Sequence, residues 1–246
     1  WSNITVRHLL THTSGIKDFI NEPTVRLDQD LTPEAVVASL VQRPLNFAPG
    51  EKYTYSNTGY HLLGMIIHQV SGKPWEEVLR ERIFRPLAMR DTDINSATCA
   101  LPSRAAGYIW ADDRLQPGMY VAPTILGYAG GGILSTVNDL ALWDAGLYSG
   151  KILKQSLLDQ MWTPATFNNG GRSTYGFGWG VKDYRGHRVV AHTGAHATGF
   201  RSTFLRFPDD QVTVVVLINE RGANPDDFGL WIAGRYIPGL RSSAPP

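Results

Sequence analysis

Residues 200–218 read FRSTFLRFPDDQVTVVVLI, two runs rich in β-branched and aromatic residues with Pro208-Asp209-Asp210 between them. Runs of this composition joined by a short turn predict a β-hairpin, with strands over Phe200–Phe207 and Gln211–Ile218. A closing helix is expected to start at residues 224–227, Asn-Pro-Asp-Asp. This segment offers a cap, a first-turn proline and two carboxylates at the positive end of the helix dipole.

Two further segments of strand composition precede the hairpin, Phe177–Val181 and Val189–His192. The chain before them is mainly helical, and the third expected helix carries Leu62, Leu63, Ile66, Ile67 and Val70 on one face. Helices are expected over Thr5–His12, Thr32–Gln42, Asn57–Val70, Trp75–Phe84, Thr136–Tyr148 and Ser156–Trp162. Helices followed by consecutive strands predict an α+β fold, an antiparallel sheet packed by helices.

We expect a single domain over residues 1–240. Residues 1–165 would form its mostly helical region, residues 166–240 would hold the strands and closing helix, and residues 241–246 would be a tail.

The composition excludes several classes of function. Hydrophobic residues make up 43% and charged residues 18%, and the formal net charge is +1, so a nucleic-acid partner is not expected. Cys99 is the only cysteine, which rules out an intrachain disulfide. The longest apolar run, Val212–Ile218, is too short to span a membrane. No set of His, Cys, Asp and Glu has metal-ligand spacing, so neither a metal nor another cofactor is expected.

Two short motifs carry candidate chemistry. Tyr55-Ser56-Asn57 stands at a loop-to-helix junction, and His192-Thr193-Gly194 stands at the end of an expected strand. Neither motif is specific alone. Tyr55 could be a half-buried ring that anchors a loop, Asn57 could cap the helix that follows, and His192 could be a structural histidine at a strand end.

The segments around these motifs indicate their function, because together they make the chain resemble the beta-lactamase-related serine hydrolases. This family includes class C beta-lactamases, D-alanyl-D-alanine carboxypeptidases, D-aminopeptidases and lactamase-like esterases. The matching segments are ITVRHLLTHTSG (4–15), PGE (49–51), YTYSNTGY (53–60), RPLAMRDT (85–92), AGGGILST (129–136), HTG (192–194) and GF (199–200).

The resemblance implies a beta-lactamase/transpeptidase-like fold and acyl transfer through a covalent serine ester. It implies that Tyr55 is the base or proton shuttle, that Asn57 binds the acyl side of the substrate and a lysine, and that His192 helps to polarise the site or contacts the substrate. Thr193 and Gly194 would bind substrate, and the backbone N–H of Ala195 would be an oxyanion-hole donor. The substrate would be a small or peptide-like molecule with an ester, amide or beta-lactam bond. Because His-Thr-Gly replaces the lysine form, an esterase or peptidase is favoured over a dedicated beta-lactamase.

The family's Ser-x-x-Lys motif normally precedes the Thr-His-Thr-Ser-Gly segment by several dozen residues. We therefore expect the nucleophile helix and the N-terminal strands to lie before Trp1, and we expect the 246-residue chain alone to be inactive and poorly soluble. The one Ser-x-x-Lys match, Ser14 to Lys17, is interpreted as chance, because Gly15 is a poor residue for a rigid nucleophile helix.

Several alternatives stay open. The chain could be a non-catalytic, penicillin-binding-like or regulatory homologue. His8 and His12 are interpreted as structural residues with helix-end hydrogen bonds, and Gly130-Gly131-Gly132 as a tight turn close to the site. The natural substrate and the oligomeric state are not predicted. A periplasmic or secreted location fits the resemblance, without being fixed by it.

Overall fold

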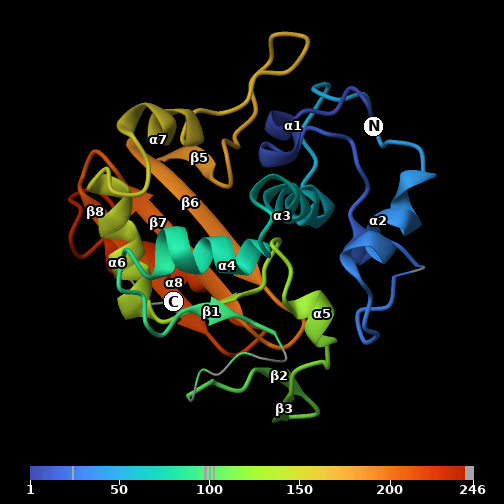
Figure 1. Cartoon of the computed structure of the whole chain (residues 1–246). Helices are drawn as coiled ribbons and strands as arrows, with labels where there is room; N and C mark the ends of the chain where they lie inside the picture. Colours follow the sequence, from blue (N-terminus) through green and yellow to red (C-terminus); the bar gives the residue numbers. More distant parts are fainter. Residues whose placement is uncertain (24, 97–98, 100, 102, 242–246) are drawn as a thin grey trace.

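The computed structural model describes residues 1–23, 25–96, 99, 101 and 103–241 (Figure 1). Of the expected tail, residues 242–246 lie outside this range. The helices are α1 (Val6–Leu10), η1 (Phe19–Asn21), α2 (Pro33–Val41), α3 (Asn57–Ser71), α4 (Trp75–Leu79), η2 (Arg80–Phe84), α5 (Pro123–Leu126), α6 (Val137–Tyr148), α7 (Gln155–Met161) and α8 (Pro225–Ala233). The strands are β1 (Asp93–Ile94), β2 (Tyr108–Ala111), β3 (Arg114–Pro117), β4 (Ile133–Leu134), β5 (Gly180–Tyr184), β6 (His187–Ala195), β7 (Arg201–Phe207) and β8 (Val212–Ile218).

The main sheet has four strands in the order β5-β6-β7-β8, and every neighbouring pair is antiparallel. The predicted hairpin is confirmed, because Arg201 to Phe207 pair with Ile218 to Val212. Two strand predictions are displaced. The strand expected over Phe177–Val181 begins at Gly180, and the strand expected over Val189–His192 extends from His187 to Ala195.

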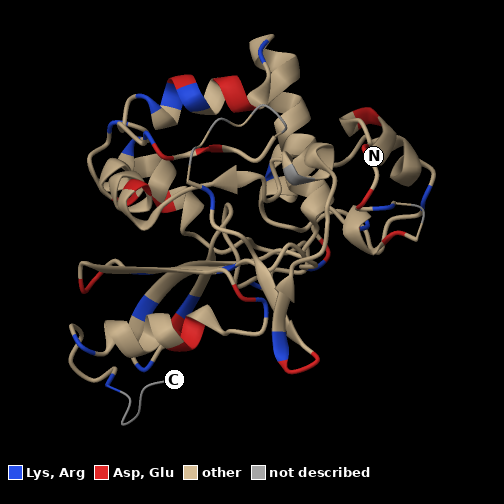
Figure 2. Cartoon of the chain, turned by 90° about the horizontal axis from the view of Figure 1, so that it is seen from below, with Lys and Arg blue, Asp and Glu red and all other residues tan. Residues whose placement is uncertain are grey.

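Neighbouring residues of a strand point to opposite faces of the sheet, and both faces are covered by helices. Val189 packs with Leu205, Phe207 and Val214 in a buried cluster that includes Ala233 and Ile237 at the end of α8 and beyond it. Val190, the next residue, packs on the other face with Leu147 of α6, Leu158 of α7, and Trp162 and Trp179. Figure 2 shows α8 and the C-terminus on one side of the sheet and most other helices on the opposite side.

Capping residues define the helix starts that the sequence predicts. Thr32 caps α2 by accepting from the N–H of Ala35, with Pro33 at the first helical position. Thr136 caps α6 in the same way, and Asn224 caps α8. Asp139, expected in the first turn of its helix, is buried there and accepts from Asp91 N–H and the Thr92 hydroxyl.

The predicted packing face of α3 is wrong. The helix itself is confirmed, with Gly72 as a left-handed C-cap, but its buried residues are Thr58, Gly59, His61 and Gly64. Ile66 is 36% exposed and Val70 82% exposed, so the apolar stripe lies partly on the surface. Small residues and one histidine face the core here because α1 approaches closely; a Cβ at Gly59 would lie 3.2 Å from Leu9 O.

No helix or strand was predicted between Arg85 and Thr136. In the structure, this segment contains the hairpin β2–β3, the two-stranded pair β1–β4 and the short helix α5. The overall prediction of an α+β fold with an antiparallel sheet is confirmed. Among the described helices, none is long and apolar enough to cross a membrane.

Candidate active site

Tyr55 and His192, which are 137 positions apart in the sequence, lie beside each other in the structure. Their ring centroids are 6.1 Å apart. Tyr55 comes from the loop that leads into α3, and His192 from the second half of β6; in Figure 1, α1 and α3 lie to the right of the sheet. Tyr55 as a whole residue remains 40% exposed, so it lies partly at the surface.

The second half of β6 has one open edge. β5 pairs only with His187 to Ala191, whereas β7 pairs along β6 as far as Ala195. Among the described strands, none pairs with His192–Ala195 on the β5 side. Thr193 and Ala195 are exposed, and Gly194 is half-buried.

The register of β6 and β7 indicates which backbone groups face this edge. His196 N–H donates to Phe200 O at the end of the ladder. Antiparallel pairs alternate between hydrogen-bonded and non-hydrogen-bonded, so the next pair, Ala195 with Arg201, is of the second kind. The N–H of Ala195 and the C=O of Thr193 therefore point away from β7. This is the direction that an oxyanion-hole donor at Ala195 requires.

Asn57 does not cap α3, so that alternative is wrong. Ser56 is the N-cap residue and Asn57 the first helical residue. The Asn57 amide instead donates from Nδ2 to Asp18 Oδ2 over 2.8 Å, which leaves its carbonyl oxygen free to accept from another donor. Gly130 lies against it, because a Cβ there would be 3.6 Å from Asn57 Oδ1. The 130–132 turn thus brings backbone close to the site, as predicted.

Asp18 is a residue of the candidate site that the sequence did not indicate. Its carboxylate caps η1 through Ile20 N–H and also accepts from Asn57. Its negative charge reaches Tyr55, whose pKa is raised by burial first and then by Asp18 and Tyr53. The available signal was weak: Asp18 is the first acidic residue in the chain and follows the Thr-Ser-Gly segment by three positions.

At neutral pH, the histidines of the candidate site are uncharged. Burial lowers the pKa of His192, and the hydrogen bond between its Nδ1 and Thr193 O, 2.7 Å long, opposes that shift. Burial also lowers the pKa of His12 to about 4, with a smaller contribution from His192. His12 Nδ1 accepts from the N–H of Ser56, the cap residue of α3, and His8 completes a capping box with Thr5. Both histidines thus make the helix-end hydrogen bonds that were predicted for them.

Ser14 does not have the geometry of a nucleophile. It lies outside any helix, is 2% exposed, and its hydroxyl accepts from Ile16 N–H. The Ser14-to-Lys17 match is therefore not a helical Ser-x-x-Lys, as the sequence analysis concluded.

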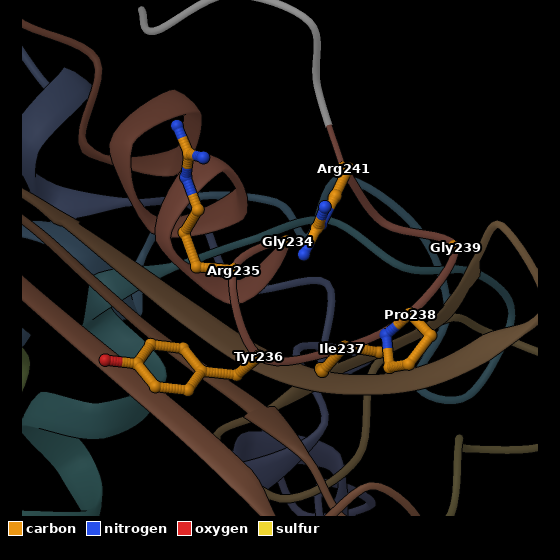
Figure 3. A pocket seen from close by; sticks show the side chains of 7 residues that line it. All are labelled: Gly234, Arg235, Tyr236, Ile237, Pro238, Gly239 and Arg241. Carbon is orange, nitrogen blue, oxygen red and sulfur yellow. The ribbon is translucent and has the colours of Figure 1, made fainter.

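Two of the hollows formed by the described residues lie elsewhere on the molecule. One is formed by the turn after α8 and is lined by residues 234–239 and Arg241 (Figure 3). The other adjoins the β6–β7 turn and includes Met119, Tyr120, Thr198 and Phe200. Neither is lined by Tyr55, Asn57 or His192. Within the described residues, no three His, Cys, Asp or Glu side chains gather in a way that could hold a metal ion.

Comparison with known proteins shows what the chain as a whole is similar to. The family model described as Beta-lactamase matches residues 1–237. A penicillin-binding protein of Bacillus subtilis is 30% identical over 96% of this chain and 56% of its own length. A D-aminopeptidase of Gluconobacter oxydans is 29% identical over 74% of this chain and 34% of its own length. The chain thus spans between a third and somewhat over half of these two relatives.

Among solved structures, a D-stereospecific amidohydrolase from Streptomyces superposes with a TM-score of 0.81. It is 26% identical, and the match covers 96% of this chain and 73% of that one. The predicted beta-lactamase/transpeptidase-like fold is therefore confirmed.

Proposed function

The chain belongs to the beta-lactamase family, and from this premise we propose that it supplies most of the active site of a serine hydrolase that cleaves amides or esters through an acyl-enzyme. The observation that carries the proposal is the approach of Tyr55 to His192, 6.1 Å between ring centroids, at the open edge of β6. A phenol, an imidazole and an unpaired strand edge are suited to proton transfer and to binding an extended acyl substrate.

The proposed nucleophile is the serine of a Ser-x-x-Lys motif in a segment before Trp1. Its Oγ attacks the substrate carbonyl carbon, and its proton passes to the lysine–Tyr55 pair. The oxyanion of the tetrahedral intermediate accepts from Ala195 N–H and a second donor. The leaving group departs with the proton, and water then cleaves the acyl-serine ester and regenerates the hydroxyl. Since Ser14 is buried, we expect the 246-residue chain alone to be inert.

The raised pKa of Tyr55 limits its role. Burial, Asp18 and Tyr53 all favour the protonated phenol, so at neutral pH Tyr55 would act as a base only beside a cation. The lysine of the proposed motif provides that cation. Tyr55 would then transfer the serine proton to the leaving group.

The proposed substrate class is a short amide or peptide with a D-amino acid on the acyl side. The relatives support this choice, because one is named a D-aminopeptidase and one a D-stereospecific amidohydrolase. The histidine at position 192, where the family also has lysine, supports an amidase or esterase over a dedicated beta-lactamase.

The complete gene product that contains residues 1–246 provides the test. We expect it to hydrolyse p-nitrophenyl butyrate, and to hydrolyse D-alanine p-nitroanilide faster than the L-isomer. Stable labelling by a fluorescent penicillin with no turnover of either chromogenic substrate would favour the non-catalytic, penicillin-binding alternative. Equal rates for the two isomers would remove the D-selectivity but leave the hydrolase.

A further inference from the structure

His12 is one of the most completely buried polar residues described, at 2% exposure, and it lies inside a cluster of tyrosines. Its ring centroid is 4.1 Å from that of Tyr55, 4.8 Å from Tyr175, 5.1 Å from Tyr60 and 6.0 Å from Tyr53. Its backbone has φ +54°, in the left-handed region that residues other than glycine seldom adopt. A conformation of this kind persists only where the surroundings hold it.

The backbone conformation of His12 allows its carbonyl oxygen and its side chain to accept hydrogen bonds from the residues on both sides of Tyr55. Thr54 N–H donates to the carbonyl oxygen of His12 over 2.9 Å. Ser56 N–H donates to its Nδ1 over 3.2 Å. The imidazole also lies over the Tyr55 ring, with 38° between the two planes. The residues before and after Tyr55 and its aromatic ring are thus all fixed by contacts to the same histidine.

The protonation state of His12 follows from these contacts. Because Nδ1 accepts from Ser56, the neutral ring carries its proton on Nε2. Nε2 has no hydrogen-bond partner among the described residues. Burial keeps the ring uncharged at neutral pH, with the pKa near 4. A neutral ring can accept at Nδ1, whereas a protonated ring would present a donor to the Ser56 N–H.

We propose that His12 is a positioning residue for Tyr55, holding the phenol beside His192 and the open edge of β6 through its carbonyl, its Nδ1 and its ring face. The proposal rests on the proposed function, because it assigns His12 an effect on catalysis that acts through Tyr55. His12 itself does not contact substrate in this role.

Two substitutions separate the contacts of His12. His12→Asn keeps an acceptor, Oδ1, near the place of Nδ1 and tolerates a positive φ, but it loses the ring. His12→Phe keeps a ring but loses the acceptor. We expect each to lower kcat for p-nitrophenyl butyrate by about tenfold while KM changes less than about twofold, since the nucleophile and binding edge are untouched. The complete gene product is used throughout.

The matched control is His61→Asn. His61 is also buried, at 1% exposure, and its Nε2 lies 3.1 Å from Pro33 O, away from Tyr55. This variant is expected to lose thermal stability but to retain the parental kcat at a temperature where it is folded.

A double-mutant cycle with Tyr55→Phe gives the decisive comparison. If His12 acts through Tyr55, adding either His12 substitution to Tyr55→Phe will change kcat by less than about twofold. An unchanged kcat in both single variants, a full tenfold loss in the Tyr55→Phe background, or failure of both His12 variants to fold would each overturn the proposal. Parental kcat in Tyr55→Phe itself would instead overturn the proposed function.

Discussion

Tyr55 is the residue on which the proposed chemistry depends most. In the proposed mechanism, removing its hydroxyl would keep the ring packing against His12 but abolish proton transfer. We expect Tyr55→Phe to lower kcat for p-nitrophenyl butyrate by about 10²–10⁴-fold, the range for loss of a general acid or base, with little change in KM. Steady-state kinetics on the complete gene product measure this.

The matched control for this substitution is Tyr53→Phe. Tyr53 is two positions away, is similarly exposed at 36%, and also packs near His12 and Tyr175. It should retain parental kcat within about threefold, because it is not adjacent to His192 in the described contacts. Equal losses in the two variants would show that the aromatic cluster, and not the Tyr55 hydroxyl, supports activity.

We expect His192 to determine the acid side of the pH profile of activity. Burial lowers its pKa below 6.5, so it becomes charged only as the pH falls below that value. We expect the activity of the parent protein to fall as the pH decreases through this acidic range. His192→Lys, which is charged throughout, should lack that limb in a plot of kcat/KM against pH. An identical acid limb in both proteins would assign it to another group.

At the scale of elements, Thr58 joins α3 to the segment that carries Asp18. Its hydroxyl donates to Lys17 O over 2.7 Å and accepts from Phe19 N–H over 2.9 Å, and the residue is fully buried. Thr58→Val would leave Phe19 N–H unsatisfied and would leave Lys17 O with only the longer hydrogen bond from the Ser56 hydroxyl, 3.4 Å long. We expect the free energy of unfolding to fall by about 2–4 kcal/mol, measured by urea denaturation.

Thr163→Val is the control for this prediction. Thr163 is exposed, and its hydroxyl donates to Asp159 O near the end of α7. Solvent can replace that hydrogen bond, so the cost should stay within about 0.5 kcal/mol. A loss of this small size for Thr58→Val would mean that the 17–19 segment is not fixed by α3.

The sequence predicted the elements whose ends are marked by local chemistry. The caps Thr32, Thr136 and Asn224 sit where they were expected, because a cap is a hydrogen bond within one turn of its helix. The start of β5 and the buried face of α3 were misplaced, since both depend on neighbours distant in the chain. The short strands β1 and β4 have only two residues each, too few for a periodic pattern.

The same distinction applies to the candidate site. Tyr55 and His192 were found through motifs, and the structure brings them together. The contact of Asp18 with Asn57 and that of His12 with Ser56 were not predicted, because these hydrogen bonds join residues 39 and 44 positions apart in the chain. No pattern within a short window encodes such pairs.

At the scale of the whole molecule, stability should decline in mild acid. The pKa of His12 is lowered from 6.5 to about 4 in the folded chain, so between these values the unfolded chain binds the extra proton. The contribution of His12 to the free energy of unfolding is therefore greatest above pH 6.5. It decreases by up to about 3 kcal/mol as the pH falls toward 4. No anion among the close neighbours of His12 offsets this, because these neighbours are tyrosines and His192, and charge on His192 lowers the pKa of His12 further.

This prediction is tested by urea denaturation between pH 7 and pH 4 for the parent and for His12→Asn. Other buried histidines, His61 and His196, also have lowered pKa values and lower the stability of both proteins alike. The parent should therefore lose more stability over this range than the variant. Parallel curves would mean that His12 is not buried as a neutral ring.

The most direct measurement is a crystal structure of the complete gene product after reaction with a slowly hydrolysed ester or beta-lactam. We predict an acyl group on a serine of a Ser-x-x-Lys motif before Trp1, with the Tyr55 hydroxyl within hydrogen-bond distance of that serine and the acyl oxygen at Ala195 N–H. An acyl group on a serine remote from Tyr55 and His192, or no covalent adduct under conditions of turnover, would contradict the account.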